Sequence, residues 1–502
     1  MLMNEMGYVL AALLLSLVLI RRGMLKLSRQ DVVWYTDPVV LLTGTWVIQS
    51  IAYALPIFIN REHVEARHIL YILLCHTAFL IGVLLVPRAS RPKGAAVDEL
   101  KITLPMLVAI GLIGLFGTFS AIYDGLATSK VGLWQRLSGE GLETIRVEKV
   151  ANAMILRGGP LASFEFLASA STVYVCLITA GVATKLALKR WQFRLLIAGA
   201  LLSILLVAFN ALMIQGGRLG IILLVLGAVM GAMMDPQRFI FRFIDRSLGR
   251  AKGAVYTLLI FGAAALVWFF ATAFIKERGG ETPPMVSLYQ YHRASPTPLV
   301  EELIGNTEEL QYALLSFSYV TVPLTTLVYY YDMPNGQFPG PYWGQYNFTG
   351  PATFAMRRMG KVRDQMTIQD IRMEATRYLR VMGYGDNVWP TLLRDLALDV
   401  GWTGVPLVML LLGFFAEWVM RSARQDGNFL QKVLGLLTGV LLIFSIAHSL
   451  LIVETFQKAF WVCFALLIYL RVSATFKPAK TPDSDLRHEH ANGSSNTVIS
   501  SS

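Results

Sequence analysis

Long apolar segments recur along this chain, and they constrain its fold more than any other feature of the sequence. A helix needs about 20 mostly apolar residues to cross the hydrocarbon core of a bilayer. With 55% hydrophobic and 15% charged residues among 502, the chain is too apolar for a soluble domain. The sequence therefore predicts an all-α, polytopic membrane protein with about 11 or 12 transmembrane helices. We expect these helices near residues 7–20, 38–59, 69–87, 103–123, 164–184, 195–214, 219–234, 254–275, 402–420, 433–450 and 455–470.

Clusters of Lys and Arg follow the first, third, fifth and seventh of these segments. By the positive-inside rule the loops that carry them are cytoplasmic, so residues 124–160 and 276–400 lie on the opposite side. The net charge of +11 comes mostly from such short loops, which indicates contact with anionic lipids and no nucleic-acid partner. The first segment has its positive charges after it and lacks a small-residue cleavage site. We interpret it as a retained anchor.

The order of segments divides the chain into four parts. Residues 1–275 hold the first eight transmembrane helices, residues 276–400 form a large outer loop, and residues 401–475 hold the last three helices. Residues 476–502 are rich in Ser, Asn and charge, and we expect a disordered cytoplasmic tail.

One segment inside the large outer loop is ambiguous. Residues 313–331 are long enough to span but contain several Ser and Thr residues and a Tyr triplet. If this segment crossed, the basic loop and tail that follow would move to the outer side, against the charge bias of the other loops. We therefore favour a re-entrant or interfacial segment, and a spanning helix remains the alternative.

Several chemistries find no support in the sequence. It contains no Walker A motif, no GxSxG, no His-rich metal pattern and no dinucleotide fingerprint, so we expect neither a metal site nor a cofactor. Cys75, Cys176 and Cys463 all lie in apolar segments without paired spacing. We interpret them as small buried apolar residues.

The part of the outer loop at residues 336–360 is dense in Gly, Pro and aromatic residues. This composition disfavours a long helix and favours a structured loop. Aromatic faces beside polar groups suit sugar rings, and a loop at the level of the lipid headgroups would have the same composition.

Two arginines beside glycines are candidates for binding a diphosphate. Arg218 lies in a Gly-rich turn between two apolar segments, and Arg278 precedes Gly279 and Gly280 on the same expected side. A guanidinium offers a planar fork of donors that matches phosphate oxygens, and the glycines would allow close approach. The alternative is that each arginine only extends to the lipid headgroups.

Further candidates lie in or near the outer loop. His292 is the only histidine of residues 276–400 and could act as a general base, although a solvated loop histidine is the alternative. Arg394 and Asp399 stand on a helix entering the membrane, where an unpaired charge is costly and usually functional. The remaining candidates for substrate binding are Arg293, the basic run at Arg357 and Arg358, Tyr384, Asn387 and Glu454, where a solvated surface or an exposed turn carboxylate is the alternative.

Three features together resemble the O-antigen polymerases of bacteria, also called oligosaccharide repeat-unit polymerases. They are the GGRLG turn at 216–220, the large outer loop late in the chain, and an Asp-x-Gly-x-x-Gly step at 399–404 that opens a helix ending Gly-Phe-Phe. The resemblance implies a GT-C-like glycosyltransferase bundle in the bacterial inner membrane, with its active site facing the periplasm. It also implies transfer of a growing glycan from undecaprenyl diphosphate to the next lipid-linked repeat unit, without nucleotide or metal.

By this resemblance, Arg218 and Arg278 would neutralise the departing diphosphate, and His292, Asp399 or Glu454 would orient or deprotonate the acceptor hydroxyl. A chain-length regulator and a flippase are expected partners because the family works with them. Two alternatives stay open. A ligase would transfer the finished glycan to a lipid core, and a flippase or transporter of lipid-linked oligosaccharide would carry charges in a cavity at mid-membrane.

Overall fold

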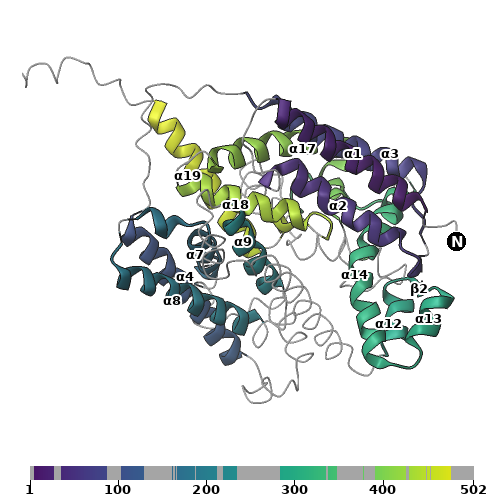
Figure 1. Ribbon diagram of the computed structural model, residues 1–502, viewed down its shortest axis with the longest axis horizontal. Coiled ribbons are helices and arrows are strands. Elements are labelled where there is room, and N and C mark those ends of the chain that lie inside the picture. Colours follow the sequence, from purple (N-terminus) through teal and green to yellow (C-terminus); the bar gives the residue numbers. More distant parts are fainter. Residues whose placement is uncertain are drawn as a thin grey trace, which may run out of the picture.

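The computed structural model is mostly helical, at 83% (Figure 1). Six helices are long and apolar enough to cross a membrane, and together they define an α-helical, multi-pass membrane protein. The only strands among the described residues form one short antiparallel ladder. The structure describes residues 5–27, 36–60, 62–87, 103–128, 161, 164, 167–186, 188–211, 219–234, 283–334, 337–347, 377, 391–424, 429–447, 449–452 and 454–475.

Ten of the eleven expected apolar segments lie wholly or mostly in the described ranges, and each contains a helix; the segment near 254–275 lies outside them. The six helices with the length and composition of a span are α1, α3, α4, α8, α14 and α17. The helices are α1 (Glu5–Leu27), α2 (Pro38–Ala54), α3 (Ala66–Leu85), α4 (Leu104–Thr128), α7 (Ser169–Thr179), α8 (Arg190–Phe209), α9 (Leu219–Met234), α12 (Pro284–Tyr291), α13 (Pro298–Ile304), α14 (Glu308–Tyr331), α17 (Leu392–Arg424), α18 (Phe429–Phe444) and α19 (Glu454–Thr475), with 3-10 turns η4 (Val182–Lys185) and η7 (Leu450–Ile452) and strands β1 (Phe58–Asn60) and β2 (Ala294–Pro296).

A first bundle consists of α1, α2, α3 and α17. Its closest approach is between α3 and α17, where a Cβ added at Gly82 would lie 1.9 Å from the carbonyl oxygen of Leu410. Reciprocally, a Cβ at Gly413 would lie 2.1 Å from the carbonyl oxygen of Phe79. Small residues of this kind let membrane helices pack backbone against backbone, so these two glycines fix the α3–α17 contact.

A second bundle is formed by α4, α7, α8 and α9, and α18 and α19 join it to the first (Figure 1). A hydrogen bond of 3.0 Å joins the hydroxyls of Thr118 on α4 and Ser171 on α7. The hydroxyl of Tyr174 donates to the carbonyl oxygen of Leu196 on α8 at 2.9 Å. Polar contacts between apolar helices thus fix the position of α7 in the centre of this bundle.

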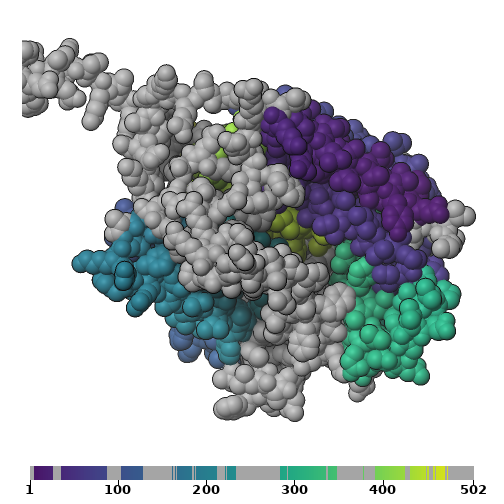
Figure 2. Space-filling view, in the orientation of Figure 1, coloured from purple at the N-terminus to yellow at the C-terminus, as the bar shows by residue number. Residues whose placement is uncertain are grey.

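A small lobe outside the bundles contains α12, β2, α13 and the first half of α14, and it is the green protrusion in Figure 2. β2 pairs antiparallel with β1, with Phe58 opposite Pro296. Phe58, Leu288, Ala294 and three residues of α14 form its hydrophobic core. Because β1 directly follows α2, the lobe is attached to the end of the first bundle where α2 ends.

α14 contacts the same end of the first bundle at both of its ends. Near its beginning, the ring of Phe317 stacks on Phe58 at 6.1 Å. At its C-terminal end, Asp332 contacts His68 Nε2 at 2.8 Å and Arg67 at 3.0 Å, in the first turn of α3. The helix also lies crosswise to α1 and α2 in Figure 1. Its length and composition would also allow a span, so the re-entrant or interfacial arrangement that the sequence favours stays a prediction.

α17 is broken near its beginning. Gly401 has φ 70° and ψ 162°, which lies in a region of backbone space that is essentially restricted to glycine. The break separates a first segment, residues 392–400, from the long apolar remainder of the helix. Residues 391–399 are all buried, so this first segment lies inside the protein.

Candidate functional site

The break in α17 creates the site by freeing backbone carbonyls. In an unbroken helix the carbonyls of Leu398 and Asp399 would accept from the amides of residues 402 and 403. Here they accept instead from the amides of Tyr342 at 2.8 Å and Trp343 at 2.9 Å. The aromatic loop at residues 337–347 therefore satisfies the end of the first segment.

The same loop is bound by the side chain of Asp399. One carboxylate oxygen accepts from the amide of Tyr346 at 2.8 Å. The other accepts from the amide of Asn347 at 2.8 Å and from Asn347 Nδ2 at 2.9 Å. Asp399 is 1% exposed, so its charge is stabilised by these charge-assisted hydrogen bonds and not by water.

Gly340 allows this close contact. Its φ is 101°, and an added Cβ would lie 2.5 Å from the carbonyl oxygen of Leu398. Any other residue would therefore strain the backbone and displace the loop from α17. The structured loop expected from the Gly- and Pro-rich composition is confirmed for residues 337–347, and the remainder of 336–360 lies outside the described ranges.

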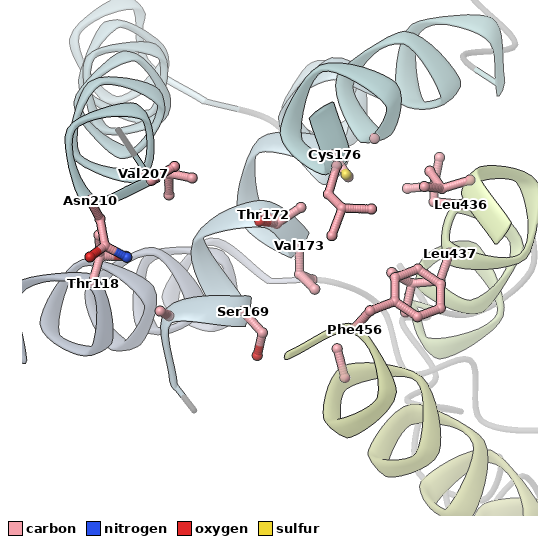
Figure 3. Close-up of a pocket in the computed structure, with 16 residues that line it drawn as sticks. Thr118, Ser169, Thr172, Val173, Cys176, Val207, Asn210, Leu436, Leu437 and Phe456 are labelled. Atoms are coloured by element: carbon pink, nitrogen blue, oxygen red, sulfur yellow. The ribbon is translucent and has the colours of Figure 1, made fainter. Parts of the chain in front are cut away.

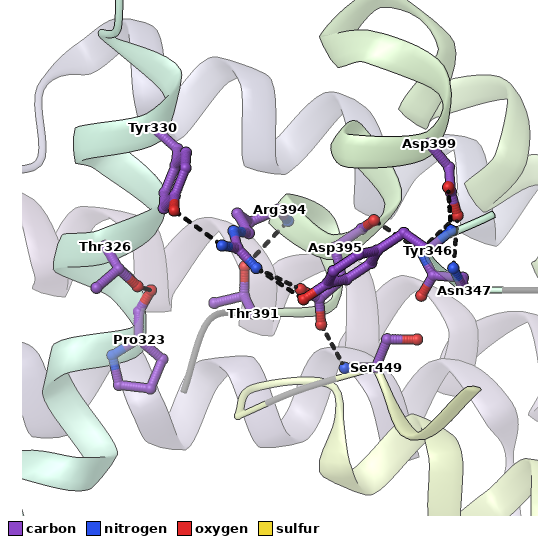
Figure 4. A network of polar contacts seen from close by, with 10 residues as sticks. All are labelled: Pro323, Thr326, Tyr330, Tyr346, Asn347, Thr391, Arg394, Asp395, Asp399 and Ser449. Atoms are coloured by element: carbon purple, nitrogen blue, oxygen red, sulfur yellow. Dashed lines mark hydrogen bonds and ion pairs between the residues drawn. The ribbon is translucent and has the colours of Figure 1, made fainter. Parts of the chain in front are cut away.

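Arg394 is fully buried and paired. Its Nη1 donates to Asp395 at 2.9 Å and to the hydroxyl of Tyr346 at 3.1 Å, and its Nη2 donates to the hydroxyl of Tyr330 at 2.9 Å (Figure 4). The guanidinium carbon also lies 4.4 Å from the centre of the Tyr330 ring. The cost of a charge at this position is thus offset by partners from α17, the loop and α14.

Asp395 and Asn347 extend the network to the turn before η7 and to α19. The second oxygen of Asp395 accepts from the amide of Ser449 at 2.8 Å. The carbonyl oxygen of Asn347 accepts from Gln457 Nε2 on α19 at 3.1 Å. One buried polar network therefore joins α14, the loop, α17, the turn before η7 and α19.

Aromatic rings surround this network at the end of the first bundle. The ring of Trp402 lies 5.3 Å from those of Phe338 and Tyr331 and 5.6 Å from that of Tyr71. Trp343 differs from these, because it is 71% exposed and has a φ of 53°. The hydrogen-bonded loop thus presents one indole ring outward from a tightly fixed backbone.

His292 lies elsewhere. It is 4% exposed, and its Nδ1 is 2.5 Å from the hydroxyl of Ser318 on α14. Burial lowers the pKa of His292 to about 4. Ser318 and Tyr330 are 12 positions apart on α14, or about 18 Å along the helix, so His292 is not in the Arg394 network. The alternative of a solvated loop histidine is wrong, because the lobe packs against this side chain.

A second buried charge cluster lies at the opposite end of the first bundle. Arg21 Nη2 is 2.8 Å from Asp37 and 3.6 Å from Glu417, and Arg421 Nη2 is 2.7 Å from Glu417. Arg421 also donates to the carbonyl oxygen of Pro87 at 3.1 Å. Sequence reasoning missed this cluster, because its charged members come from three segments, α1, the start of α2 and α17, and each looks like an ordinary flanking charge.

The structure brings only part of the expected site together. Arg394 and Asp399 belong to one network, and His292 and Arg293 lie at the start of β2, in the lobe. The network residues Tyr330, Tyr346, Asn347 and Gln457 were not expected, although the Tyr triplet was a visible signal. Outside the described residues are Arg218, Arg278, Arg357, Arg358, Tyr384, Asn387 and the side chain of Glu454.

The chain matches no protein-family model and shows no significant similarity to any curated protein or solved structure. The resemblance to repeat-unit polymerases therefore rests on the short sequence features given above. The structure adds a broken helix, a loop fixed to it by a buried carboxylate, and an exposed aromatic ring. These features define a candidate binding site at one end of a multi-pass membrane protein.

Proposed function

We propose that this protein polymerises lipid-linked oligosaccharide repeat units at the outer face of a bacterial inner membrane. The observation that carries the proposal is the aromatic loop at 337–347, which is fixed to the broken α17 at the end of the first bundle. Flat aromatic faces with nearby hydrogen-bonding groups suit sugar rings. The exposed Trp343 and the aromatic residues behind it would bind the glycan beside the membrane surface.

The proposed reaction transfers the growing glycan from undecaprenyl diphosphate to a hydroxyl of the next lipid-linked repeat. The bond from the anomeric carbon to the diphosphate oxygen breaks, a glycosidic bond forms to the acceptor oxygen, and the acceptor proton leaves with a base. Undecaprenyl diphosphate is the leaving group, and Arg218 and Arg278 remain the candidates for stabilising its charge. No nucleotide or metal enters this scheme.

The structure changes the roles proposed for two candidate bases. Both oxygens of Asp399 already accept hydrogen bonds, and His292 is buried against Ser318. A general base must reach the proton that it removes. We therefore assign Asp399 as a positioning residue for the loop and leave His292 out of the reaction, so that Glu454 remains among the proposed bases.

The architecture is part of the proposal. About 11 crossings in a GT-C-like arrangement would place residues 276–400 on the periplasmic side. In this arrangement the five long apolar helices other than α14 would cross together with α2, α7, α9, α18, α19 and the expected segment near 254–275. A chain-length regulator and a flippase would be the protein partners.

One observation favours a second function, transport of a lipid-linked oligosaccharide. A broken helix with buried charges is typical of secondary transporters. In this chain, however, Arg394, Asp395 and Asp399 make hydrogen bonds with protein groups, and the cavity described below has no charged residue among its described lining. The polymerase therefore stays the first proposal, and a ligase shares its chemistry.

Trp343→Ala tests the proposal, with Trp191→Ala as a matched control. Both tryptophans are exposed, at 71% and 61%, but Trp191 lies in the first turn of α8 in the second bundle. The surface polysaccharide of cells carrying only one variant is resolved on a gel, with membrane levels of the protein measured alongside. We expect Trp343→Ala to shift the ladder toward single repeat units at normal protein level, and Trp191→Ala to leave it unchanged.

The other outcomes discriminate between the proposals. Long chains that remain on their lipid carrier would support a ligase, and repeat units trapped on the cytoplasmic face would support a flippase. An unchanged ladder in both variants would show that Trp343 only anchors the loop to lipid headgroups. Arg218→Ala, analysed in the same way, tests whether that arginine serves the transfer.

A further inference from the structure

The second bundle contains a cavity that the proposed function does not use. It has a volume of about 160 Å³ and lies among α4, α7, α8, α9, α18 and α19 (Figure 3). Most of its lining is aliphatic, from Val173, Val207, Leu223, Leu437 and similar residues. An engineered cavity of about 150 Å³ with apolar walls takes up benzene and stays free of water. A space of this size therefore suits a short apolar group.

The cavity wall contains one amide oxygen that has no partner among the described residues. Asn210 is 7% exposed, and its Oδ1 is buried and makes no hydrogen bond with the described part of the protein. Its side chain points into the space between α4, α7 and α8 in Figure 3. A buried amide oxygen that makes no hydrogen bond loses its hydration without compensation, so such a group is normally satisfied by a ligand or water.

Three hydroxyl residues also line the cavity, and one of them, Thr172 on α7, is half-buried and offers a second polar group to a ligand. Thr118 donates to the carbonyl oxygen of Gly114 at 2.9 Å and contacts Ser171. Ser169 also has a partner. The site thus combines aliphatic walls with a single open amide at one edge. A ligand that fits must have a hydrocarbon body and one small polar group.

We propose that this cavity is a binding site for a lipid alcohol, with the hydrocarbon chain among the aliphatic side chains and the hydroxyl at the amide of Asn210. A hydroxyl both donates and accepts, so it satisfies whichever side of the amide it meets. A charged headgroup is disfavoured, because no described lining residue carries the opposite charge. The site is independent of the polymerase reaction and is tested without measuring glycan synthesis.

Photolabelling of the full-length protein in membranes tests the proposal. The probes are a six-carbon alcohol with a diazirine in its chain and the alkane of equal length with the same group. We expect the alcohol to label residues 168–176 and 456–459 several-fold more than the alkane does. Both probes should label the exposed residues of α1, such as Leu13 and Leu19, to a similar extent, because these side chains offer no hydrogen bond.

Two variants identify the group responsible. Asn210→Leu keeps the approximate volume and removes the amide, so it should abolish the preference for the alcohol. Asn60→Leu makes the same change at another buried asparagine, in β1, and should preserve it. Equal labelling of the cavity by both probes in the unmodified protein would overturn the hydroxyl assignment, and no labelling there would overturn the site.

Lipids that copurify with the protein identify the natural source. A lipid alcohol retained by the unmodified protein and lost from Ala459→Phe, which fills the cavity from α19, supports the proposal. Its mass distinguishes an isoprenoid alcohol from an acylglycerol. Recovery of phospholipid alone, in equal amount from both proteins, contradicts it. Size-exclusion chromatography of Ala459→Phe confirms that the variant is folded.

Discussion

Arg394, Asp399 and His292 show how strongly single buried polar residues depend on their partners. Arg394 and Asp399 are stabilised by hydrogen bonds from segments far away in the sequence. Among the described residues, the His292 side chain contacts the hydroxyl of Ser318, and the ring of Tyr319 packs edge-on against it at 4.6 Å. The charged form of this histidine has no acidic neighbour among these contacts, which makes it sensitive to pH.

We expect acid to destabilise the lobe through His292. Its pKa falls from an ordinary 6.5 to about 4, so the folded protein favours the neutral ring. The corresponding stability is fully present above about pH 6.5 and is lost as the pH falls toward 4, by about 3 kcal/mol in total. Thermal unfolding of the detergent-solubilised protein across this pH range measures the effect.

His292→Gln is the control for this titration, because glutamine keeps a polar side chain that does not ionise. The variant should lose less stability between about pH 6.5 and pH 4 than the unmodified protein. Parallel losses in the two proteins would show that other groups cause the acid sensitivity and that His292 is not responsible.

At the scale of elements, the break in α17 is the feature that organises the site. It directs the buried segment 392–400 toward α14 and leaves two carbonyls for the aromatic loop. Gly401 has no heavy atom within 4 Å of an added Cβ, so space does not require a glycine there. The backbone conformation of residue 401, with φ 70° and ψ 162°, is what requires a glycine.

Gly401→Ala should therefore destabilise the protein by about 1–3 kcal/mol through backbone strain alone. Gly44→Ala is the matched control, because Gly44 also has open space around an added Cβ but lies in the regular helix α2. Alanine at this position should be neutral or stabilise the protein by up to about 1 kcal/mol. Thermal unfolding in one detergent compares the two variants. Equal stability would show that the backbone at residue 401 can adopt a conformation that alanine allows, with no loss of stability.

At the scale of the whole molecule, the end of the first bundle where α3 begins carries the lobe, α14, the aromatic loop and the Arg394 network. The opposite end carries the Arg21, Asp37 and Glu417 cluster. From the flanking charges of the sequence we expect this second end to face the cytoplasm. The lobe and the loop then share the outer side, which requires that α14 does not cross.

Site-directed cysteine labelling tests this arrangement. In a background without the three native cysteines, Asn306→Cys and Gln337→Cys place thiols before and after α14, and both original side chains are exposed. A membrane-impermeant reagent should label both from the same side and should label Arg22→Cys only from the other. Labelling of positions 306 and 337 from opposite sides would show that α14 spans the membrane.

The secondary structure was largely readable from the sequence, because the need to satisfy backbone polar groups in a bilayer leaves few alternatives to helices. Helices formed at all ten expected segments that the structure describes. The ambiguity of residues 313–331 was also visible, since Ser, Thr and Tyr are mixed there with apolar residues. Length and composition did not decide whether this helix spans the membrane. Its contacts with Phe58, Arg67 and His68 bring both of its halves to the same end of the first bundle, which no sequence pattern indicates.

The sequence by itself determined an apolar, helical, multi-pass chain and marked Arg394 and Asp399 as unusual charges near a membrane boundary. Only the tertiary structure decided what these charges contact. Apart from the neighbouring Asp395, their partners lie 48 to 64 positions away, and hydrogen bonds have no periodic signature in sequence. The same reason explains why the burial of His292 and the open amide of Asn210 were not foreseen. Apolar patterning is a local property, whereas the satisfaction of a buried polar group depends on every segment that packs around it.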